Sequence, residues 1–463
     1  MNPPNSPGPV VFMPHYHEAI HTFRPVSDRL AAEGIPVLYL LENRDGVSPG
    51  VCRELGLPWR RIPAFKWGRH LPGGPPAFFR ESHRAWRFVR EFMQTVRPSA
   101  LVMTDDRRFV ESLLVAQGRR RKTFSLVVMW AATNPPGTMT QWRERAAYNR
   151  SLESVAGQTV DQIRAALVRW IVQWVAPQAL RHGPDGRLLL WQPLSAILAM
   201  ALLGCYPRHP WVLGGGWAEA AAVVGERYRD MIAAEGVPVS KIHVAGHPRH
   251  DRTIADGVRW RGPERETIRR EIGAPKAGRL VALAAPPVAH ILRGTRAGHI
   301  APETMAGYLR YVVGELLALG GDVHLAVKIH PRDADLPLSW LDGHDREFSV
   351  VRAEMEAARL IGAADLLVCQ GSSVVFDAHL LDVPTVTFDF FRTPGYDMWA
   401  KAGGVLHVTE PAAFSETVRH ALDDPETRQR LAAERKEFRR THLRDDGKAT
   451  ERIFDLIRGR MGR

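Results

Sequence analysis

The chain has 463 residues, a length that allows two or three domains with substantial hydrophobic cores. Its 45% of hydrophobic and 24% of charged residues are typical of a globular protein and exclude an intrinsically disordered chain. The net charge of +12 and a pI of about 10.0 indicate attraction to anionic partners, although charge alone does not choose between a nucleotide, an anionic lipid and a polyanionic polymer.

Cysteines and the N-terminus narrow the class of protein further. Cys52, Cys205 and Cys369 are far apart and odd in number, so the sequence predicts neither a disulfide framework nor a CxxC metal site. The first residues form neither a basic region nor an apolar leader. We therefore expect a cytoplasmic protein, with a peripheral position on the cytoplasmic face of the cell membrane as a further option.

Strands and helices alternate in the first 130 residues. The pattern predicts strands over residues 10–13, 36–41, 100–103 and 123–130, and helices over residues 18–33 and 81–96. A β-α-β opening of this kind is typical of a doubly wound parallel sheet. We expect an N-terminal Rossmann-like domain over residues 1–255.

An apolar helical insertion is predicted near residues 155–205. Residues 160–175 form an apolar helix that carries Trp170 and Trp174, and residues 188–203 are the most hydrophobic segment, interrupted by Gln192-Pro193. That segment is too short and too broken for a membrane span of about 20 residues. Two interpretations stay open: a buried domain helix, or an interfacial helix pair with tryptophans at the depth of the lipid headgroups.

A second β/α series follows from about residue 279. Strands are expected over residues 280–284, 323–329, 366–369 and 385–388, and the final helices over 411–422, 425–440 and 449–458. The polar, Gly- and Pro-containing segment 251–265 is the candidate interdomain linker. The second Rossmann-like domain is therefore expected over residues 262–463.

A candidate anion site lies between two elements of the second domain. The strand at 366–369 runs into Gln370-Gly371-Ser372-Ser373, and residues 374–381 then have helical spacing. Free backbone N–H groups, the positive end of the helix dipole and two hydroxyls would converge there on a phosphate. The alternative is simple capping of the helix by serine.

Four motifs in order resemble CDP-glycerol glycerophosphotransferases and related glycosyltransferases of capsule and surface-polysaccharide synthesis. They are Gly246-His-Pro-Arg-His-Asp251, Lys328-Ile-His-Pro-Arg332, Gly371-Ser-Ser-Val-Val-Phe-Asp377 with Pro384, and Asp446-Gly-Lys-Ala-Thr-Glu-Arg452. The resemblance runs from about residue 211 to the end. It implies an α/β fold of the GT-B type, in which two Rossmann-like domains face across a cleft and C-terminal helices pack back.

The resemblance also implies roles for residues of the second domain. His330 would donate to the donor's diphosphate, assisted by Lys328 or Arg332, at strand ends that face the ligand. Gly371 would shape the phosphate turn, and Asp377 would accept the ribose hydroxyls. A structural histidine and an ordinary exposed helix acid are the alternatives for His330 and Asp377.

The first domain should supply the acceptor site and a base. His15, His17 and His21 cluster after the first strand, and a neutral imidazole can take a hydroxyl proton near pH 7. We favour His17 or His15 as this base, with Asp105 or Asp106 as rivals. The histidine spacing also permits a metal, but no thiol or second acidic ligand is evident nearby and GT-B transferases generally use none, so no metal is expected.

The sequence departs from its relatives after the strand at 123–130. Glycerophosphotransferases carry a His-Gly motif there, whereas this chain continues Trp130-Ala-Ala-Thr-Asn-Pro-Pro-Gly-Thr138. The identity of the base and of the transferred group therefore stays open. Nonhydrolysing UDP-N-acetylglucosamine 2-epimerases are similar over residues 98–106, but this chain lacks a glutamate near Trp130, which favours transfer over epimerisation.

We expect a transferase that moves a glycosyl or glycerol-phosphate-type group from a CDP- or UDP-linked donor, without a separate cofactor. The acceptor would be a surface polysaccharide, a teichoic-acid-like polymer or a lipid-linked precursor. An anionic membrane is a further expected partner, and nucleic acid is not. The alternatives are a UDP-sugar 2-epimerase and a non-catalytic GT-B subunit of a polysaccharide biosynthesis complex.

Overall fold

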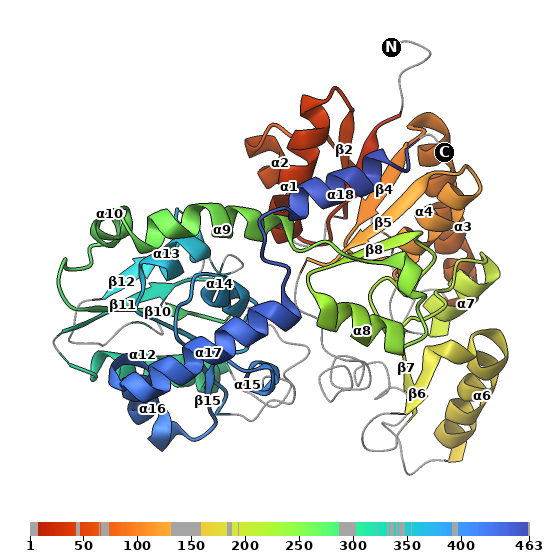
Figure 1. Cartoon of the computed structure of the whole chain (residues 1–463). Helices are drawn as coiled ribbons and strands as arrows, with labels where there is room; N and C mark the ends of the chain where they lie inside the picture. The colour runs from red at the N-terminus through yellow and green to blue at the C-terminus, as the bar shows by residue number, and fades with distance from the viewer. Residues whose placement is uncertain are drawn as a thin grey trace. The chain divides into compact units, whose positions relative to one another are not determined.

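The computed structural model describes residues 8–42, 47–63, 74–130, 159–182, 188–192, 194–286, 302–320, 322–330, 348–352, 354–390 and 397–461, with the single residues 65, 333, 338 and 341. The chain divides into two compact units (Figure 1). Unit 1 comprises residues 1–249 and 448–463, and unit 2 comprises residues 250–447. The boundary therefore precedes the predicted linker, and the chain returns to unit 1 at its end.

In the described residues, unit 1 contains a seven-stranded parallel sheet of order β3-β2-β1-β4-β5-β8-β9. Its strands are β1 (Val10–Met13), β2 (Val37–Glu42), β3 (Trp59–Ile62), β4 (Ala100–Met103), β5 (Phe124–Val128), β8 (Ala220–Val223) and β9 (Ile242–Val244). The strand order reverses between β1 and β4. Such a switch point is where open α/β sheets bind ligands, outside the carboxyl ends of the strands.

Helices cover the sheet of unit 1. They are α1 (His17–Ala32), α2 (Ser48–Glu54), α3 (Gly74–Thr95), α4 (Phe109–Arg119), α8 (Glu226–Ala234) and α18 (Ala449–Arg458). Helix α1 shows why the sequence folds this way, because its Ile20, Phe23 and Leu30 recur at helical spacing and are buried in the core. The predicted helix at 18–33 is confirmed within one residue at each end.

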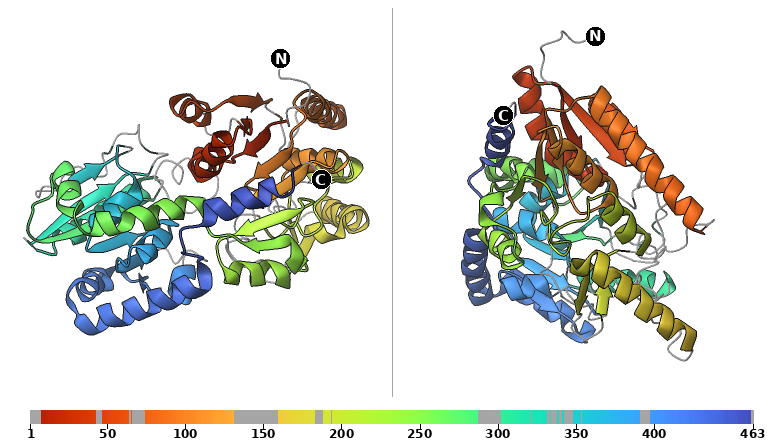
Figure 2. Two further views of the ribbon diagram at one scale, coloured as in Figure 1. Left: turned by 45° about the horizontal axis from the view of Figure 1, so that its top comes forward. Right: turned by 90° about the vertical axis from the view of Figure 1, so that its right-hand side faces the viewer.

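The C-terminal helix α18 belongs to unit 1, next to α1 (Figure 2). Ile453, Phe454 and Ile457 are buried in the core of unit 1, and the Arg452 guanidinium donates a 2.8 Å hydrogen bond to the Ala245 carbonyl. Packing back of the chain's end was expected, but the predicted domain boundaries kept this helix in the second domain. The amphipathic pattern of α18 indicates that one face of the helix is buried. The pattern does not indicate which of the two units this face packs against.

The insertion lies between β5 and β8. Its described helices cover fewer residues than the sequence predicted. It comprises α6 (Thr159–Val175), β6 (Leu180–His182), β7 (Leu188–Leu190) and α7 (Leu194–Leu202), with β6 and β7 antiparallel. The helical interpretation of residues 188–203 is wrong at the start of the segment, because three leucines form β7, and α7 begins at Leu194, after the interruption at Gln192-Pro193. Within the described residues, no helix is long and apolar enough to cross a membrane.

Unit 2 contains, in the part of the chain that is described, a six-stranded parallel sheet of order β12-β11-β10-β13-β14-β15. Its strands are β10 (Arg279–Ala284), β11 (Val323–Lys328), β12 (Ser349–Val351), β13 (Leu366–Cys369), β14 (Thr385–Phe388) and β15 (Leu406–Val408). Here the strand order reverses between β10 and β13. The second switch point therefore lies where β13 ends.

The helices of unit 2 are α9 (Pro248–Arg261), α10 (Arg265–Glu271), α12 (Pro302–Leu317), α13 (Ala357–Ala363), α14 (Val374–Leu380), α15 (Met398–Ala402), α16 (Phe414–Asp423) and α17 (Pro425–His442). Most of the segment predicted as a linker is helix α9. Its Trp260 is buried, and a Cβ added to Gly257 would lie 2.6 Å from Leu381. The glycine that suggested a linker instead allows a close helix contact.

Candidate functional site

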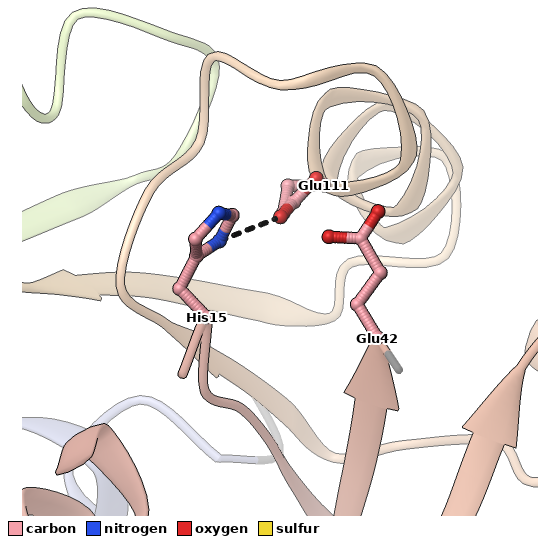
Figure 3. Close-up of side chains that lie close together, drawn as sticks. All are labelled: His15, Glu42 and Glu111. Atoms are coloured by element: carbon pink, nitrogen blue, oxygen red, sulfur yellow. Dashed lines mark ion pairs between the residues drawn. The ribbon is translucent and has the colours of Figure 1, made fainter. Parts of the chain in front are cut away.

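At the switch point of unit 1, His15 approaches an acidic side chain. It follows β1 directly, is 4% exposed, and its Nδ1 lies 3.6 Å from Oε1 of Glu111 in the first turn of α4 (Figure 3). Both positions follow from the topology, because β1 and the loop before α4 end at the same edge of the sheet. The carboxylate can orient the imidazole and stabilise its protonated form.

Glu42, the last residue of β2, completes this group. One ligand atom from each of His15, Glu42 and Glu111 lies within 4.8 Å of the others. Figure 3 shows both carboxylates on the same side of the imidazole. The chemistry of one nitrogen and two carboxylate donors would also suit a divalent cation, so the group is a candidate for either proton transfer or cation binding.

Aromatic side chains lie beside His15. Its ring makes an edge contact with Tyr16 at 4.9 Å between centroids, and Tyr16 lies 5.8 Å from Trp130 after β5. A ring nitrogen of His247, after β9, lies 3.1 Å from the Trp130 carbonyl. Side chains that follow three parallel strands, β1, β5 and β9, thus lie close together at this edge of the sheet.

The three histidines predicted to cluster do not all join this group. His17 begins α1, is buried, and its Nδ1 lies 3.5 Å from the Glu18 carboxylate. His21 is exposed on α1. The structure therefore groups His15, and not His17, with Glu42 and Glu111.

Asp105 and Asp106 are held in structural contacts. Burial opposes ionisation of Asp105, but the Arg107 and Arg108 guanidiniums hold its pKa well below the usual range, and Arg107 forks onto it at 2.8 Å. Asp106 is 0% exposed, accepts from the Ala218 N–H and lies 3.8 Å from Lys241. Its pKa is raised, chiefly by burial. This placement favours a structural role for Asp106 over the predicted catalytic one.

At the switch point of unit 2, the predicted phosphate turn follows β13. Gly371 has φ +56°, the left-handed region that glycine adopts without strain. Ser373 is exposed and precedes α14 without making a side-chain capping hydrogen bond, while Ser372 Oγ accepts a long 3.4 Å bond from the Val374 N–H. Helix capping therefore does not account for Ser373, and its hydroxyl stands at the edge where a ligand would bind.

The other three residues predicted to contact the donor, His330, Lys328 and Arg332, differ in how far the structure supports that role. His330 is half-buried and follows β11, which is separated from β13 only by β10, so about 10 Å of sheet lies between them. Lys328 is buried, its ammonium donates to the Arg352 carbonyl, and burial lowers its pKa. Arg332 lies outside the described residues.

Asp377 is buried between two helices. It accepts a 3.2 Å hydrogen bond from the Thr253 hydroxyl of α9 and is 1% exposed. His250, also on α9, packs edge-on against Phe376 of α14. These contacts favour the packing of α9 on α14 as the role of Asp377, rather than the predicted contact to ribose.

Sequence reasoning missed the acidic partners of both switch points. Glu111 and Glu42 lie far from His15 in sequence, and Asp389, which accepts a 3.4 Å bond from the Gln370 amide, lies after β14. Glu42 and Asp389 are acids at or just after a strand end, and that position was the available signal for them. Glu111 lies in the first turn of α4 and carried no such signal.

Two Rossmann-like units in one chain, each with polar groups at a switch point, define a protein of the GT-B fold class. The chain belongs to the CDP-Glycerol:Poly(glycerophosphate) glycerophosphotransferase family, whose family model matches residues 219–459, just over half of the chain. It is therefore a transferase by family. The match covers the whole of unit 2 and confirms the resemblance that the four motifs indicated, whereas His15, Glu42 and Glu111 lie outside it.

Solved structures with the same fold are distant in sequence. The UDP-GlcNAc 2-epimerase from Neisseria meningitidis is 10% identical with a TM-score of 0.56, over 97% of this chain and 99% of that chain. The glycotransferase of kitacinnamycin is 15% identical with a TM-score of 0.56, over 98% and 99%. A variant of the wall teichoic acid polymerase TagF with CDPG is 14% identical with a TM-score of 0.53, over 98% and 90%. No curated protein matches the chain significantly in sequence.

Proposed function

We propose that the protein transfers a glycerol-phosphate-type group from a CDP-linked donor to a hydroxyl of a polymer or lipid-linked acceptor. The observation that carries this proposal is the phosphate turn Gly371-Ser372-Ser373 at the switch point of unit 2, inside the segment matched by the family. Backbone N–H groups and an uncapped hydroxyl suit a diphosphate. Family membership favours glycerol phosphate over a glycosyl group as the cargo.

Unit 1 supplies the base in this proposal. The acceptor oxygen attacks the β-phosphorus of the donor, and the bond from that phosphorus to CMP breaks as the new phosphodiester bond forms. The hydroxyl proton passes to His15, and the Glu111 carboxylate at 3.6 Å stabilises the resulting imidazolium. CMP leaves with the electron pair, and His330 offsets the negative charge that grows on it.

A panel of activated donors tests the proposal. Purified protein is incubated with CDP-glycerol, other CDP-linked polyols and UDP-sugars, with and without a glycerol phosphate acceptor, and released nucleotides are measured. We expect acceptor-dependent release of CMP from a CDP-linked donor. Interconversion of a free UDP-sugar would support the epimerase alternative, and failure to bind any nucleotide would support a non-catalytic subunit.

We also propose that α6 contacts an anionic membrane on its cytoplasmic face. Trp170 and Trp174 lie one turn apart, with ring centroids 6.3 Å apart, and are 62% and 76% exposed, and the adjacent Leu167 is exposed as well. Exposed tryptophans on one helix face suit the headgroup region, and the net charge of +12 adds attraction to anionic lipid. Such a position would bring the protein to a lipid-linked acceptor.

Vesicle flotation at low salt tests this contact. We expect a Trp170→Ala/Trp174→Ala variant to lose binding to anionic vesicles. The matched control is Val239→Ala/Val258→Ala, which removes apolar side chains that are similarly exposed elsewhere. Equal binding by both variants and the wild-type protein would refute the role of α6.

A further inference from the structure

A polar pocket of about 400 Å³ lies in unit 2, away from the phosphate turn. It is lined by Arg261 of α9, by Asp365 and Asp382 at the starts of β13 and β14, and by Arg428 and Arg435 of α17. The phosphate turn follows the other end of β13. Because a four-residue strand spans about 13 Å, the pocket and the turn lie at opposite edges of the sheet.

The two carboxylates of the pocket already have cationic partners. Asp365 lies 2.6 Å from Arg265 and 3.8 Å from Arg269, and Asp382 accepts from Nε and Nη2 of Arg435 at 2.9 and 2.7 Å. The three arginines of the pocket, together with Arg265 and Arg269, outnumber its two carboxylates. The pocket therefore carries an excess of positive charge. It comes from Arg428, an exposed residue, and from Arg261, whose Nη1 donates a 2.9 Å hydrogen bond to the Ala364 carbonyl.

Arg435, one of the residues that line the pocket, has an unsatisfied donor. The residue is 2% exposed, and its Nη1 is buried without a hydrogen-bond partner in the part of the chain that is described. A buried charged donor without an acceptor is costly, so such groups generally meet an anion, a carbonyl or water. Burial lowers the pKa of Arg435. The Asp382 carboxylate raises this pKa, whereas the positive charges of Arg439 and Arg428 lower it.

The backbone also indicates that the position of Arg435 is specified. Asp382 has φ +53°, in the left-handed region that aspartate and asparagine adopt more readily than other residues with a side chain, and its carboxylate accepts from Arg435. A Cβ added to Gly404 would lie 2.8 Å from Cγ of Arg435 and 2.5 Å from His379. The arginine is thus fixed by a carboxylate on one side and close packing on the other.

We propose that Arg261, Arg428 and Arg435 form a second anion site, which binds a phosphate-type oxyanion independently of the donor site. Guanidinium groups match the geometry of phosphate oxygens, and three of them converge on one pocket of suitable size. The oxyanion is either free phosphate or the phosphodiester of an anionic polymer. The site does not depend on the proposed transfer reaction.

Binding is tested with inorganic phosphate, pyrophosphate and a glycerol phosphate polymer, by calorimetry and thermal shift at constant ionic strength against chloride. We expect phosphate-type ligands to bind and to stabilise the protein, and Arg428→Gln and Arg261→Gln each to weaken this binding about tenfold. Arg430→Gln is the matched control, because Arg430 is on the same helix, is exposed and pairs with Glu434. The control should bind as the wild-type protein does.

Comparison of the ligands identifies the source of the oxyanion. Tighter, Arg428-dependent binding of the polymer assigns a phosphodiester, and equal binding of inorganic phosphate assigns a free anion; both outcomes support the site. Binding that does not exceed chloride, or an equal loss in Arg430→Gln, would overturn it, because the attraction would then be non-specific. Donor affinity should stay unchanged in all three variants, which separates this site from the donor site. The unliganded melting temperature should stay unchanged in Arg428→Gln and Arg430→Gln, so weaker binding by Arg428→Gln cannot come from misfolding, whereas Arg261→Gln also loses the hydrogen bond to the Ala364 carbonyl.

Discussion

The switch points of the two units occupy the same place in similar sheets and carry different chemistry. In unit 1 the strand ends bring together His15, Glu42 and Glu111, which are titratable side chains in a largely buried site. In unit 2 the strand end presents Gly371 and Ser373, a backbone turn with a hydroxyl. One arrangement suits the movement of a proton and the other suits the holding of a phosphate, so the fold supplies the place and the local residues supply the function.

The largest effect should come from removing the imidazole of unit 1. We expect His15→Asn to lower kcat by about 10²- to 10⁴-fold, because general base catalysis is lost, while donor affinity stays unchanged. The control is His17→Asn, which should retain activity. Transfer rates and donor binding are measured on the same preparations, and the opposite pattern would assign the base to His17.

The next effect concerns the acid stability of unit 2. His379 on α14 is buried against the carbonyls of Val375 and Gly403, and burial lowers its pKa to about 4. Between that value and about 6.5 the unfolded state binds one more proton than the folded state. Stability should therefore fall as the pH drops from about 6.5 to 4, by about 3 kcal/mol at most.

Hydrogen exchange of α14 amides at pH 7 and pH 5 measures this loss. A His379→Gln variant cannot take up the proton, so its exchange should depend less on pH than that of the wild-type protein. Exchange in α1 of unit 1 serves as the internal reference. An equal pH dependence in variant and wild type would show that other groups cause the acid sensitivity.

Glu111 should act through His15 as a positioning residue. We expect Glu111→Gln to lower kcat/KM by about ten- to hundredfold, because the imidazolium loses a nearby negative charge. The acidic limb of the pH–rate profile should also move to lower pH, a change that a purely structural role would not produce. Glu18→Gln, next to His17, is the control and should leave the profile in place.

The smallest effect is expected at the phosphate turn. A Ser372→Ala/Ser373→Ala variant should bind the donor about tenfold more weakly, because two hydroxyls are lost while the backbone donors stay. Ser240→Ala, an exposed serine of unit 1, is the control. Unchanged affinity in the double variant would remove the serines from the donor site.

The sequence allowed prediction where the elements of a site follow one another in the chain. β13, the turn at 370–373 and α14 are consecutive, so this strand–turn–helix unit was visible as a local pattern. The acidic partners of His15 were not, because only the folding of β2 and α4 brings Glu42 and Glu111 to β1. Likewise, the amphipathic pattern of α18 predicts a buried face but carries no information on which unit it joins.

Acceptor-dependent release of CMP tests the central claim most directly. Purified protein is given CDP-glycerol with and without a glycerol phosphate acceptor, and CMP and the new phosphodiester are measured together. The proposed function predicts that both appear in equal amounts and only when acceptor is present. Binding of CDP-glycerol without any acceptor-dependent CMP, or turnover of a UDP-sugar in its place, would contradict it.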